Sequence, residues 1–280
     1  MIMRTLTAAA LLCAGSPLIA QTGPGSELPD PNDRSNSLTL AVGAAAVPDY
    51  EGADSYQLIP AAAVRGRVGG MDFWSSGTKL YLDVFGRPAG GMDFDAGPIV
   101  GVRLNRSGKI KDDAVDDLPE LDPAIEVGGF AGLSFHGLTN PYDTLSMRVD
   151  YLTDVGGAHE SSLITPSIAF STPLSRTLYV SASASAEWAG DGYADYYYSI
   201  SPAESVDSGL AIHEADGGLK EWKLGLTALS AFSGDLTHGW ALFASGSYSH
   251  LLGDFADSPL VDDRGSASQW MAAVGLAYTF

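Results

Sequence analysis

Apolar and polar residues alternate with a period of two along most of the chain after residue 36. In 178–188, one face is apolar from Leu178 to Trp188, whereas the opposite face carries Ser181 and Ser183. This period predicts β-strands rather than helices. The same pattern predicts strands at 38–47, 57–68, 71–85, 94–104, 124–136, 142–155, 160–171, 178–188, 219–233, 238–250 and 268–280.

These segments are about as long as the 9–11 residues that a tilted membrane strand needs. A water-soluble β-sandwich also alternates, but three features favour a membrane protein. The apolar faces are uninterrupted, the opposite faces are mainly Ser, Gly, Ala and Thr, and aromatic residues collect near strand ends as in a membrane girdle. Those aromatic residues are Trp188, Trp222, Trp240, Trp270 and Tyr278. The sequence therefore predicts an all-β fold, a transmembrane antiparallel up-and-down β-barrel.

The number of strands follows from closure of such a barrel, which favours an even number. Eleven segments are clear, so either 71–85 is two short strands broken at Gly77, or 193–201 is a further strand. We expect twelve strands, with ten as the alternative. Residues 202–208, capped by Ser201, are predicted to form a helical turn.

The connections predict an orientation in the outer membrane. If Phe280 ends in the periplasm, the long acidic connections lie outside and the short ones inside, as in known barrels. The outer connections are then 105–123, 156–159, 190–218 and 251–267, and the periplasmic ones are 137–141, 172–176 and 233–238.

The N-terminus has the layout of a cleaved secretory signal peptide. Arg4 precedes a short apolar run that ends before Pro17, and Ala20 offers a small residue at the cut. We therefore expect a signal peptide at 1–20, a flexible periplasmic leader at 21–36 and a barrel domain at 37–280. The only cysteine, Cys13, lies in the signal, so the exported chain is predicted to have no disulfide and no thiolate ligand.

The formal net charge of −19 argues against binding to nucleic acid, which needs a basic face. Most of this charge falls in the predicted loops and leader, whereas the inward strand positions carry both signs. The predicted lumen-facing charges are Arg65, Arg67, Lys79, Asp83, Arg103, Glu126, Arg148, Asp150, Glu187, Glu221 and Lys223. A mixed-sign lumen favours paired charges that partly close the bore, and the alternative is a narrow, weakly selective pore.

Few residues suggest metal binding or catalysis. Asp112, Asp113, Asp116 and Asp117 are weak candidates for contact with a divalent cation, but they lack EF-hand spacing and more often form a solvated loop. The five histidines show no zinc spacing, and no nucleophile-elbow motif accompanies them. Two His–Asp pairs, His250 with Asp254 and His238 with Asp235, share strand ends. We predict no enzyme activity, no cofactor and no resident metal.

Several motifs, in their order along the chain, resemble the family of MltA-interacting protein (MipA) and OmpV. The motifs are PDYEGAD at 48–54, GPIVGVRL at 97–104 with the acidic loop after it, EVGGFAG at 126–132, YADYYY at 193–198 followed by SPA, and GLK at 218–220. The resemblance covers nearly all of the exported chain and departs most at Tyr197 and Tyr198. The end at Phe280 is similar to the signal read by the barrel-assembly machinery. The segment 48–54 itself is predicted to be a turn selected for shape rather than a binding site.

The resemblance implies a non-catalytic barrel in the cell outer membrane, surrounded by lipid and lipopolysaccharide. Members of the family are described as scaffolds that join a lytic transglycosylase to a murein synthase, or as adhesin-like or porin-like surface proteins. Our first hypothesis is such a scaffold, with the periplasmic turns and the leader 21–36 as the docking surface. The second is a narrow diffusion pore, and the third is a hydrolase on the barrel wall.

Overall fold

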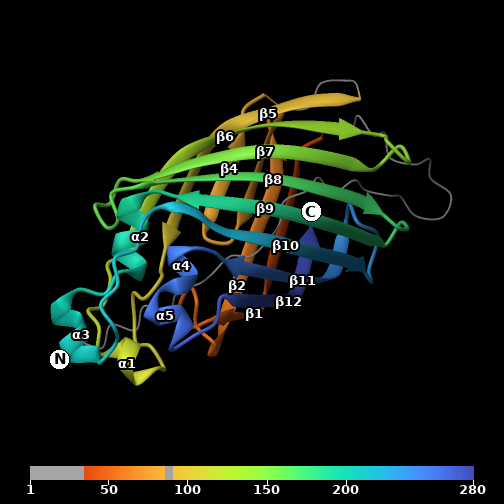
Figure 1. Ribbon diagram of the computed structural model, residues 1–280. Helices are drawn as coiled ribbons and strands as arrows, with labels where there is room; N and C mark the ends of the chain where they lie inside the picture. The colour runs from red at the N-terminus through yellow and green to blue at the C-terminus, as the bar shows by residue number, and fades with distance from the viewer. Residues whose placement is uncertain (1–34, 86–90) are drawn as a thin grey trace.

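The structure is a computed structural model that describes residues 35–85 and 91–280. The predicted signal peptide, Cys13 and all of the leader before residue 35 lie outside the described residues. Twelve antiparallel strands form one closed barrel, in which each strand pairs with its neighbours in sequence and β1 pairs with β12 (Figure 1). The strands are β1 (Ser37–Pro48), β2 (Tyr56–Val68), β3 (Met71–Ser76), β4 (Lys79–Asp83), β5 (Met92–Arg103), β6 (Ala124–His136), β7 (Thr144–Asp154), β8 (Ser162–Pro173), β9 (Leu178–Ala189), β10 (Gly218–Ala231), β11 (Gly239–Leu251) and β12 (Ser268–Thr279). The predicted fold class and strand number are confirmed.

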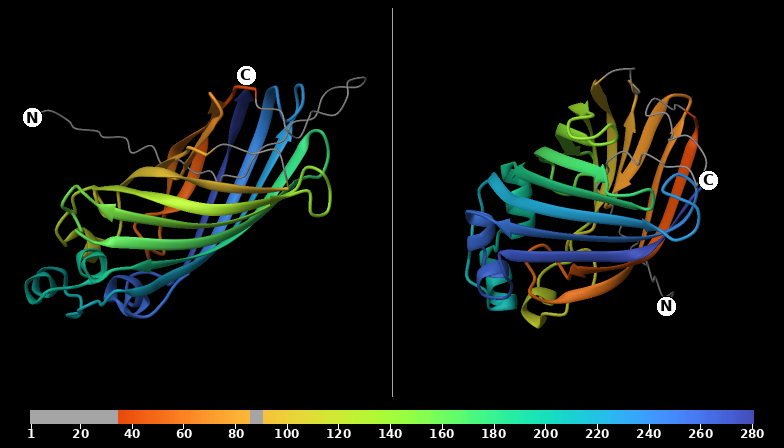
Figure 2. Two further views of the ribbon diagram at one scale, coloured as in Figure 1. Left: turned by 90° about the horizontal axis from the view of Figure 1, so that it is seen from above. Right: turned by 90° about the vertical axis from the view of Figure 1, so that its right-hand side faces the viewer.

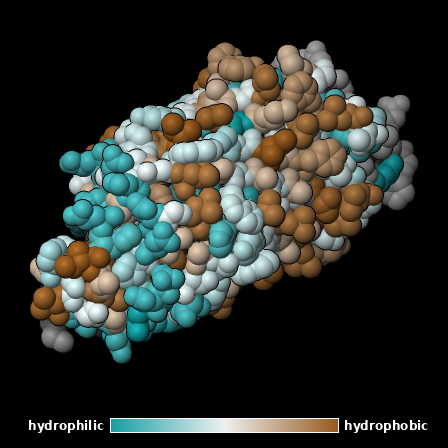
Figure 3. Space-filling model, in the orientation of Figure 1, coloured by the Kyte–Doolittle hydropathy of each residue, from teal (hydrophilic) through white to brown (hydrophobic). Residues whose placement is uncertain are grey.

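The alternation along each strand separates a lumen face from a membrane face. On β10, Leu224 and Leu226 are exposed on the outside, whereas Lys223 and Thr227 line the lumen. Neighbouring strands match in register, so that Leu224 lies opposite Tyr248 of β11. Figure 3 shows hydrophobic residues gathered over the strands and hydrophilic residues toward the end that carries the helices. This belt is what a lipid bilayer requires of a barrel.

The twelfth strand comes from 71–85, which divides into the short hairpin β3–β4. Gly77 turns the chain between them with φ of 60°, a left-handed conformation that favours glycine. The other option, a strand at 193–201, is wrong, because helix α2 (Asp191–Tyr198) occupies most of that segment. Tyr193, Ala194, Tyr197 and Tyr198 fall on one helical face and are buried together.

The predicted helical turn at 202–208 is confirmed as α3 (Pro202–Ser208). The Ser201 side chain accepts from the Glu204 backbone N–H, and the Glu204 carboxylate accepts from the Ser201 N–H, which forms a capping box. Pro202 takes an early helical position, and Gly209 ends the helix with φ of 75°.

The two ends of the barrel differ, as Figure 2 shows. One end carries short turns and the start of β1 beside the end of β12. The other carries α2, α3, and the short helices α1 (Asp113–Asp116), α4 (Asp254–Asp257) and α5 (Pro259–Asp262). We call the helix-bearing end the outer end, because outer-membrane barrels place long loops outside and short turns in the periplasm. No helix among the described residues is long and apolar enough to span a membrane.

The loops at the outer end pack into one hydrophobic core, which we call the outer lid (49–55, 104–123, 190–217 and 252–267). Phe255 of α4 packs edge-on against Tyr198 of α2, with ring centroids 5.1 Å apart. The Tyr50 hydroxyl donates to the Leu260 carbonyl oxygen at 2.8 Å. Segments far apart in sequence therefore form one packed layer across the outer end.

Candidate functional site

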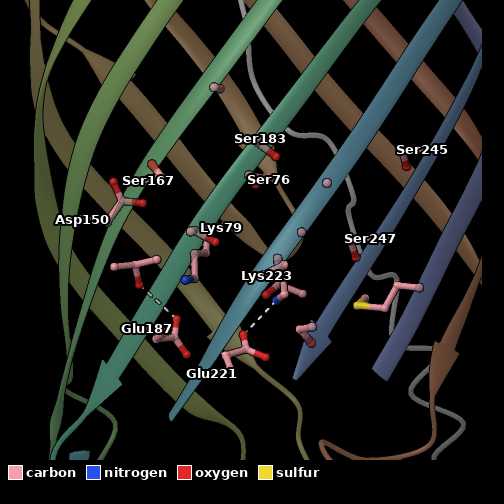
Figure 4. A pocket seen from close by; sticks show the side chains of 18 of the residues that line it. Ser76, Lys79, Asp150, Ser167, Ser183, Glu187, Glu221, Lys223, Ser245 and Ser247 are labelled. Carbon is pink, nitrogen blue, oxygen red and sulfur yellow. Dashed lines mark hydrogen bonds and ion pairs between the residues drawn. The ribbon is translucent and has the colours of Figure 1, made fainter. Parts of the chain in front are cut away.

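The barrel encloses a cavity of about 620 Å³ in which side chains from most strands converge (Figure 4). Every charged residue predicted to face the lumen lines this cavity, except Arg67. Arg67 instead pairs with Asp72 of β3 through two contacts, Nε to Oδ1 at 2.7 Å and Nη2 to Oδ2 at 2.6 Å.

Several of the lumen charges form ion pairs of opposite sign. Arg148 Nε lies 2.7 Å from Asp150 Oδ1, and Lys223 Nζ lies 3.0 Å from Glu221 Oε1. The Arg148 guanidinium also lies over the Tyr81 ring, 4.7 Å from its centroid. The Tyr81 hydroxyl donates to Asp150 at 2.9 Å. Charges of opposite sign are therefore paired on the lumen wall.

Three further charges occupy different settings. Asp83 is buried and accepts hydrogen bonds from the backbone N–H groups of Phe85 and Ala96. Arg65 lines the cavity on β2. Lys79, at the start of β4, also lines the cavity; its side chain feels the charges of Glu187, Glu126 and Asp150 but makes no hydrogen bond or close ion pair with a residue that the structure describes.

The cavity ends, toward the outer lid, in a network centred on the Glu51 carboxylate. Oε1 accepts from Arg103 Nη1 at 2.7 Å, and Oε2 lies 3.2 Å from Lys220 Nζ. Oε2 also accepts from the hydroxyls of Tyr193 at 2.6 Å and Tyr198 at 3.1 Å. Glu51 therefore joins a lid loop to two barrel strands and to α2.

Lys220 reaches this network because β10 carries a β-bulge between Leu219 and Glu221. Strict alternation from Glu221 would turn Lys220 toward the membrane. The extra residue breaks the alternation, so that Lys220 and Glu221 both point inward and Lys220 is only 2% exposed. Its ammonium group lies 2.6 Å from the Glu187 carboxylate of β9.

Arg103 and Glu126 extend the network around the wall. Arg103 Nε donates to Glu126 Oε1 at 2.7 Å, and Arg103 Nη1 donates to the Tyr193 hydroxyl at 3.1 Å. His159 Nε2 lies 3.4 Å from Glu126 Oε1, and the His159 ring packs against Tyr193. The network thus contains several close charge pairs held by aromatic groups.

The electrostatic surroundings of Glu51, next to the outer lid, determine which groups of the network are charged. Burial raises the pKa of Glu51, but the Lys220 and Arg103 cations and the Tyr193 hydrogen bond outweigh burial and lower that pKa from 4.5 to about 2. Burial, joined by the charge of Glu51, raises the pKa of the Tyr193 and Tyr198 hydroxyls well above their usual range. Both tyrosine hydroxyls consequently stay protonated as donors to an ionised Glu51.

Each family-like motif supplies a member of this network. Glu51 comes from 48–54, Arg103 from 97–104, Glu126 from 126–132, Tyr193 and Tyr198 from 193–198, and Lys220 from 218–220. Strand alternation predicts Arg103, Glu126 and Glu187 as inward charges, but it does not reveal Glu51, Lys220 or the tyrosines. The available signal was their presence in the motifs. The segment 48–54 does turn the chain, and it also carries the central carboxylate.

The acidic loop is occupied by structural contacts. Asp112 caps α1 by accepting from Ala114 and Val115, and it pairs with Arg264 at 2.7 Å. Asp116 accepts from the Ile110 N–H at 2.8 Å. Asp113 and Asp117 are exposed. Among residues 35–85 and 91–280, no group of three or more His, Cys, Asp or Glu side chains is arranged to hold a metal ion.

The two His–Asp pairs from the sequence analysis are not aligned for catalysis. His250 Nδ1 lies 3.2 Å from Ser268 Oγ, and His238 joins Asp235 through backbone groups. A different set of hydrogen bonds links Asp93, His136 and Thr144. His136 Nε2 lies 2.9 Å from Asp93 Oδ2, and His136 Nδ1 lies 2.9 Å from Thr144 Oγ1. Thr144 is only 1% exposed, so its hydroxyl does not present an accessible nucleophile.

Solved structures with a similar shape are also β-barrels. A NanC porin covers 86% of this chain with 8% identity and a TM-score of 0.45 over 98% of its own length. An outer membrane channel from Pseudomonas putida F1 covers 90% of this chain with 12% identity and a TM-score of 0.46 over 99% of its length.

Comparison of the sequence with known proteins is more specific than comparison of the fold. MltA-interacting protein of Escherichia coli (strain K12) is 29% identical over 94 residues, which are 34% of this chain and 35% of that relative. The same figures hold for the protein of that name from Shigella flexneri. The alignment thus spans about a third of the curated relatives. The profile of the family described as "MltA-interacting protein MipA" matches residues 40–280, which is nearly the whole barrel. The chain therefore belongs to the MltA-interacting protein (MipA) family.

Proposed function

We propose that this barrel is a non-catalytic outer-membrane scaffold that binds a murein lytic transglycosylase at its periplasmic end and links it to a murein synthase. Membership of a family named for an interaction with MltA supports this proposal. The observation that carries it is the outer lid, whose packed core and Glu51 network lie across the outer end of the bore. A barrel with a covered mouth fits an anchor better than a diffusion pore.

The docking surface lies on the periplasmic turns. Leu138, Leu174 and Phe232 are exposed there, just outside the strands. Apolar side chains at the centre of a small contact supply much of its binding energy. The turns are short, so the leader at 21–36 would add contact area by folding on the partner.

Affinity capture tests the scaffold directly. The tagged full-length protein is recovered from detergent-solubilised envelopes, and its companions are identified by mass spectrometry. We expect a lytic transglycosylase and a murein synthase from the wild type, with both reduced at least ten-fold when residues 21–36 are deleted or when Leu138, Leu174 and Phe232 are changed to Ser.

A matched control changes exposed apolar residues at the opposite end. Val206→Ser with Ile212→Ser removes side chains of the outer lid that are equally solvent-accessible, and capture should be unchanged. Recovery of abundant porins and assembly factors alone would contradict the scaffold. Single-channel conductance of the purified protein tests the pore alternative, for which a stable open conductance would be required.

A further inference from the structure

One stretch of β2 has a strand on only one side. β2 pairs with β1 along residues 56–67, but its pairing with β3 runs only from Arg65 to Val68. No described strand pairs with residues 56–63 on the β3 side. At about 3.3 Å per residue, this free edge is roughly 25 Å long.

The short β3–β4 hairpin causes this free edge. β3 has 6 residues and β4 has 5, whereas β2 has 13 and β5 has 12. β4 in turn pairs with β5 only up to Lys79 and Gly101. The result is a gap in the wall, which we call the notch, bounded by 56–63 of β2, the hairpin tip at 76–79 and the end of β5 at 101–104.

A lid segment spans the outer end of the notch. Lys111 Nζ donates to the Tyr56 carbonyl oxygen at 2.5 Å, and the Lys111 N–H donates to Asp49 Oδ2 at 2.7 Å. The notch is therefore a window in the side of the barrel, closed above by the lid and below by the hairpin.

The two faces of the notch differ in character. Gln57, Ile59, Ser76, Thr78 and Lys79 line the central cavity, so the notch borders the lumen. The residues around its membrane side are apolar and exposed: Leu58, Leu80, Val100, Val102 and Leu104. A molecule that occupies the notch would meet an apolar rim first and polar groups behind it.

Lipid cannot satisfy those backbone groups of 57–63 that no described strand pairs on the β3 side, because a hydrocarbon chain offers no hydrogen bonds. Unpaired backbone at membrane depth is tolerated where it lines a water-filled cavity, and here the cavity lies directly behind it. We propose that the notch is a lateral opening through which an amphiphile with an apolar chain and an anionic head group enters from the outer leaflet and binds its head group at Lys79.

The charges around the notch favour this occupant. The Lys79 side chain stands at the hairpin tip without a hydrogen bond or close ion pair to a described residue, whereas Lys220 and Lys223 are held by Glu187 and Glu221. Glu187, Glu126 and Asp150 act on Lys79 electrostatically, but each lies close to another cation, namely Lys220, Arg103 and Arg148. An anionic head group would give Lys79 a close ion pair of its own. The outer lid covers the axial route, so the side of the barrel is the shorter path from the membrane.

A strand from another protein fits less well. Pro60 lies on the free edge of β2, and proline on an edge strand hinders the addition of a further strand. Such a strand would also give the Lys79 ammonium group no close ion pair. The opening does not depend on the scaffold function, because it lies on the wall and not on the periplasmic turns.

Photo-crosslinking tests the opening with the purified full-length protein in detergent. The probes are a photoreactive palmitic acid and, in a second arm, a photoreactive lysophosphatidylglycerol, which distinguish a carboxylate from a phosphate head group. Mass spectrometry should place most labelling at 56–64, 76–80 and 101–104. Unlabelled palmitate or lysophospholipid should compete with the probe that is recognised.

Variants separate the opening from nonspecific labelling. Lys79→Met should reduce labelling at low probe concentration at least ten-fold, Lys79→Arg should retain it, and Thr78→Trp should block it by filling the notch. Lys109→Gln removes a charge from an exposed lid side chain and should have no effect. Heat-modifiable migration on gels confirms that each barrel is folded, and Thr78→Trp keeps the test valid if Lys79→Met does not fold.

Labelling spread evenly around the apolar belt, or equal labelling of wild type and Lys79→Met, would overturn the proposal. So would a peptide or a second chain crosslinked along β2 in place of the probes. If the protein fails to capture a transglycosylase but is still labelled at the notch, the scaffold proposal is contradicted and the lateral opening is not.

Discussion

Lys220 Nζ lies 2.6 Å from the Glu187 carboxylate, although strict strand alternation would place Lys220 on the membrane face. The bulge in β10 brings it inward, where it also lies 3.2 Å from Glu51. A barrel strand and a lid loop thus share one buried cation. This arrangement explains how the outer lid is fastened to the wall.

Lys220→Met should strongly destabilise the protein, because it leaves the buried Glu187 and the partly buried Glu51 without their shared cation. Loss of one partner from a buried pair costs about 3–5 kcal/mol. Denaturant unfolding in detergent measures the change. Lys109→Gln, which removes an exposed lysine 3.9 Å from Asp116, should cost less than about 1 kcal/mol. Equal effects of the two variants would contradict the proposed network.

The stability of the outer lid should depend on pH through Glu51. Its pKa falls from 4.5 to about 2 on folding, so its contribution is present above about 4.5 and is lost as the pH falls toward 2. The full effect is on the order of 3 kcal/mol. Hydrogen exchange of residues 49–55 between pH 5 and pH 2 measures it. Glu51→Gln should weaken the lid at neutral pH and flatten this dependence, and an unchanged dependence in that variant would assign it to other groups.

Phe255→Ala should loosen the lid without unfolding the barrel. Phe255 is 1% exposed, and truncation of a buried phenylalanine costs about 3–5 kcal/mol. The lid core meets the wall only near strand ends, at Leu163, Ala189 and Leu251, and is distinct from the hydrophobic cluster of the barrel wall, so the loss should be local. Protease cleavage within 190–217 and 252–267 should accelerate, while heat-modifiable migration stays normal. Val206→Ala, at an exposed position, is the control, and barrel unfolding at the same rate as lid cleavage would disprove a local effect.

Gly43→Ala should impair closure of the barrel. Gly43 of β1 lies opposite Gly275 of β12, at the seam that joins the two ends of the chain. A methyl group at Gly43 would overlap the Val274 carbonyl oxygen and the Gly275 Cα, which are backbone atoms and cannot move aside cheaply. The folded fraction on a heat-modifiability gel should fall. Gly108→Ala, where no atom lies near the added methyl group, should fold normally.

The sequence by itself determined the barrel and which residues of most strands face the lumen, and it favoured twelve strands over ten. The reason is that lipid outside and water inside impose a period of two on every strand, and that period is visible residue by residue in β9 and β10. The same parity identified Arg103, Glu126 and Glu187 as inward charges. The sequence left open whether the twelfth strand comes from a division of 71–85 at Gly77 or from 193–201, and the β3–β4 hairpin decides for the first.

Only the tertiary structure decided what the loops do and where the pattern breaks. Glu51, Tyr193 and Lys220 are far apart in sequence and meet because the lid folds back over the barrel. The bulge at Lys220 and the free edge of β2 depend on hydrogen bonds between strands. Such pairing has no local signature in the sequence, because apolar and polar residues alternate along a strand in the same way whether or not a neighbouring strand is present.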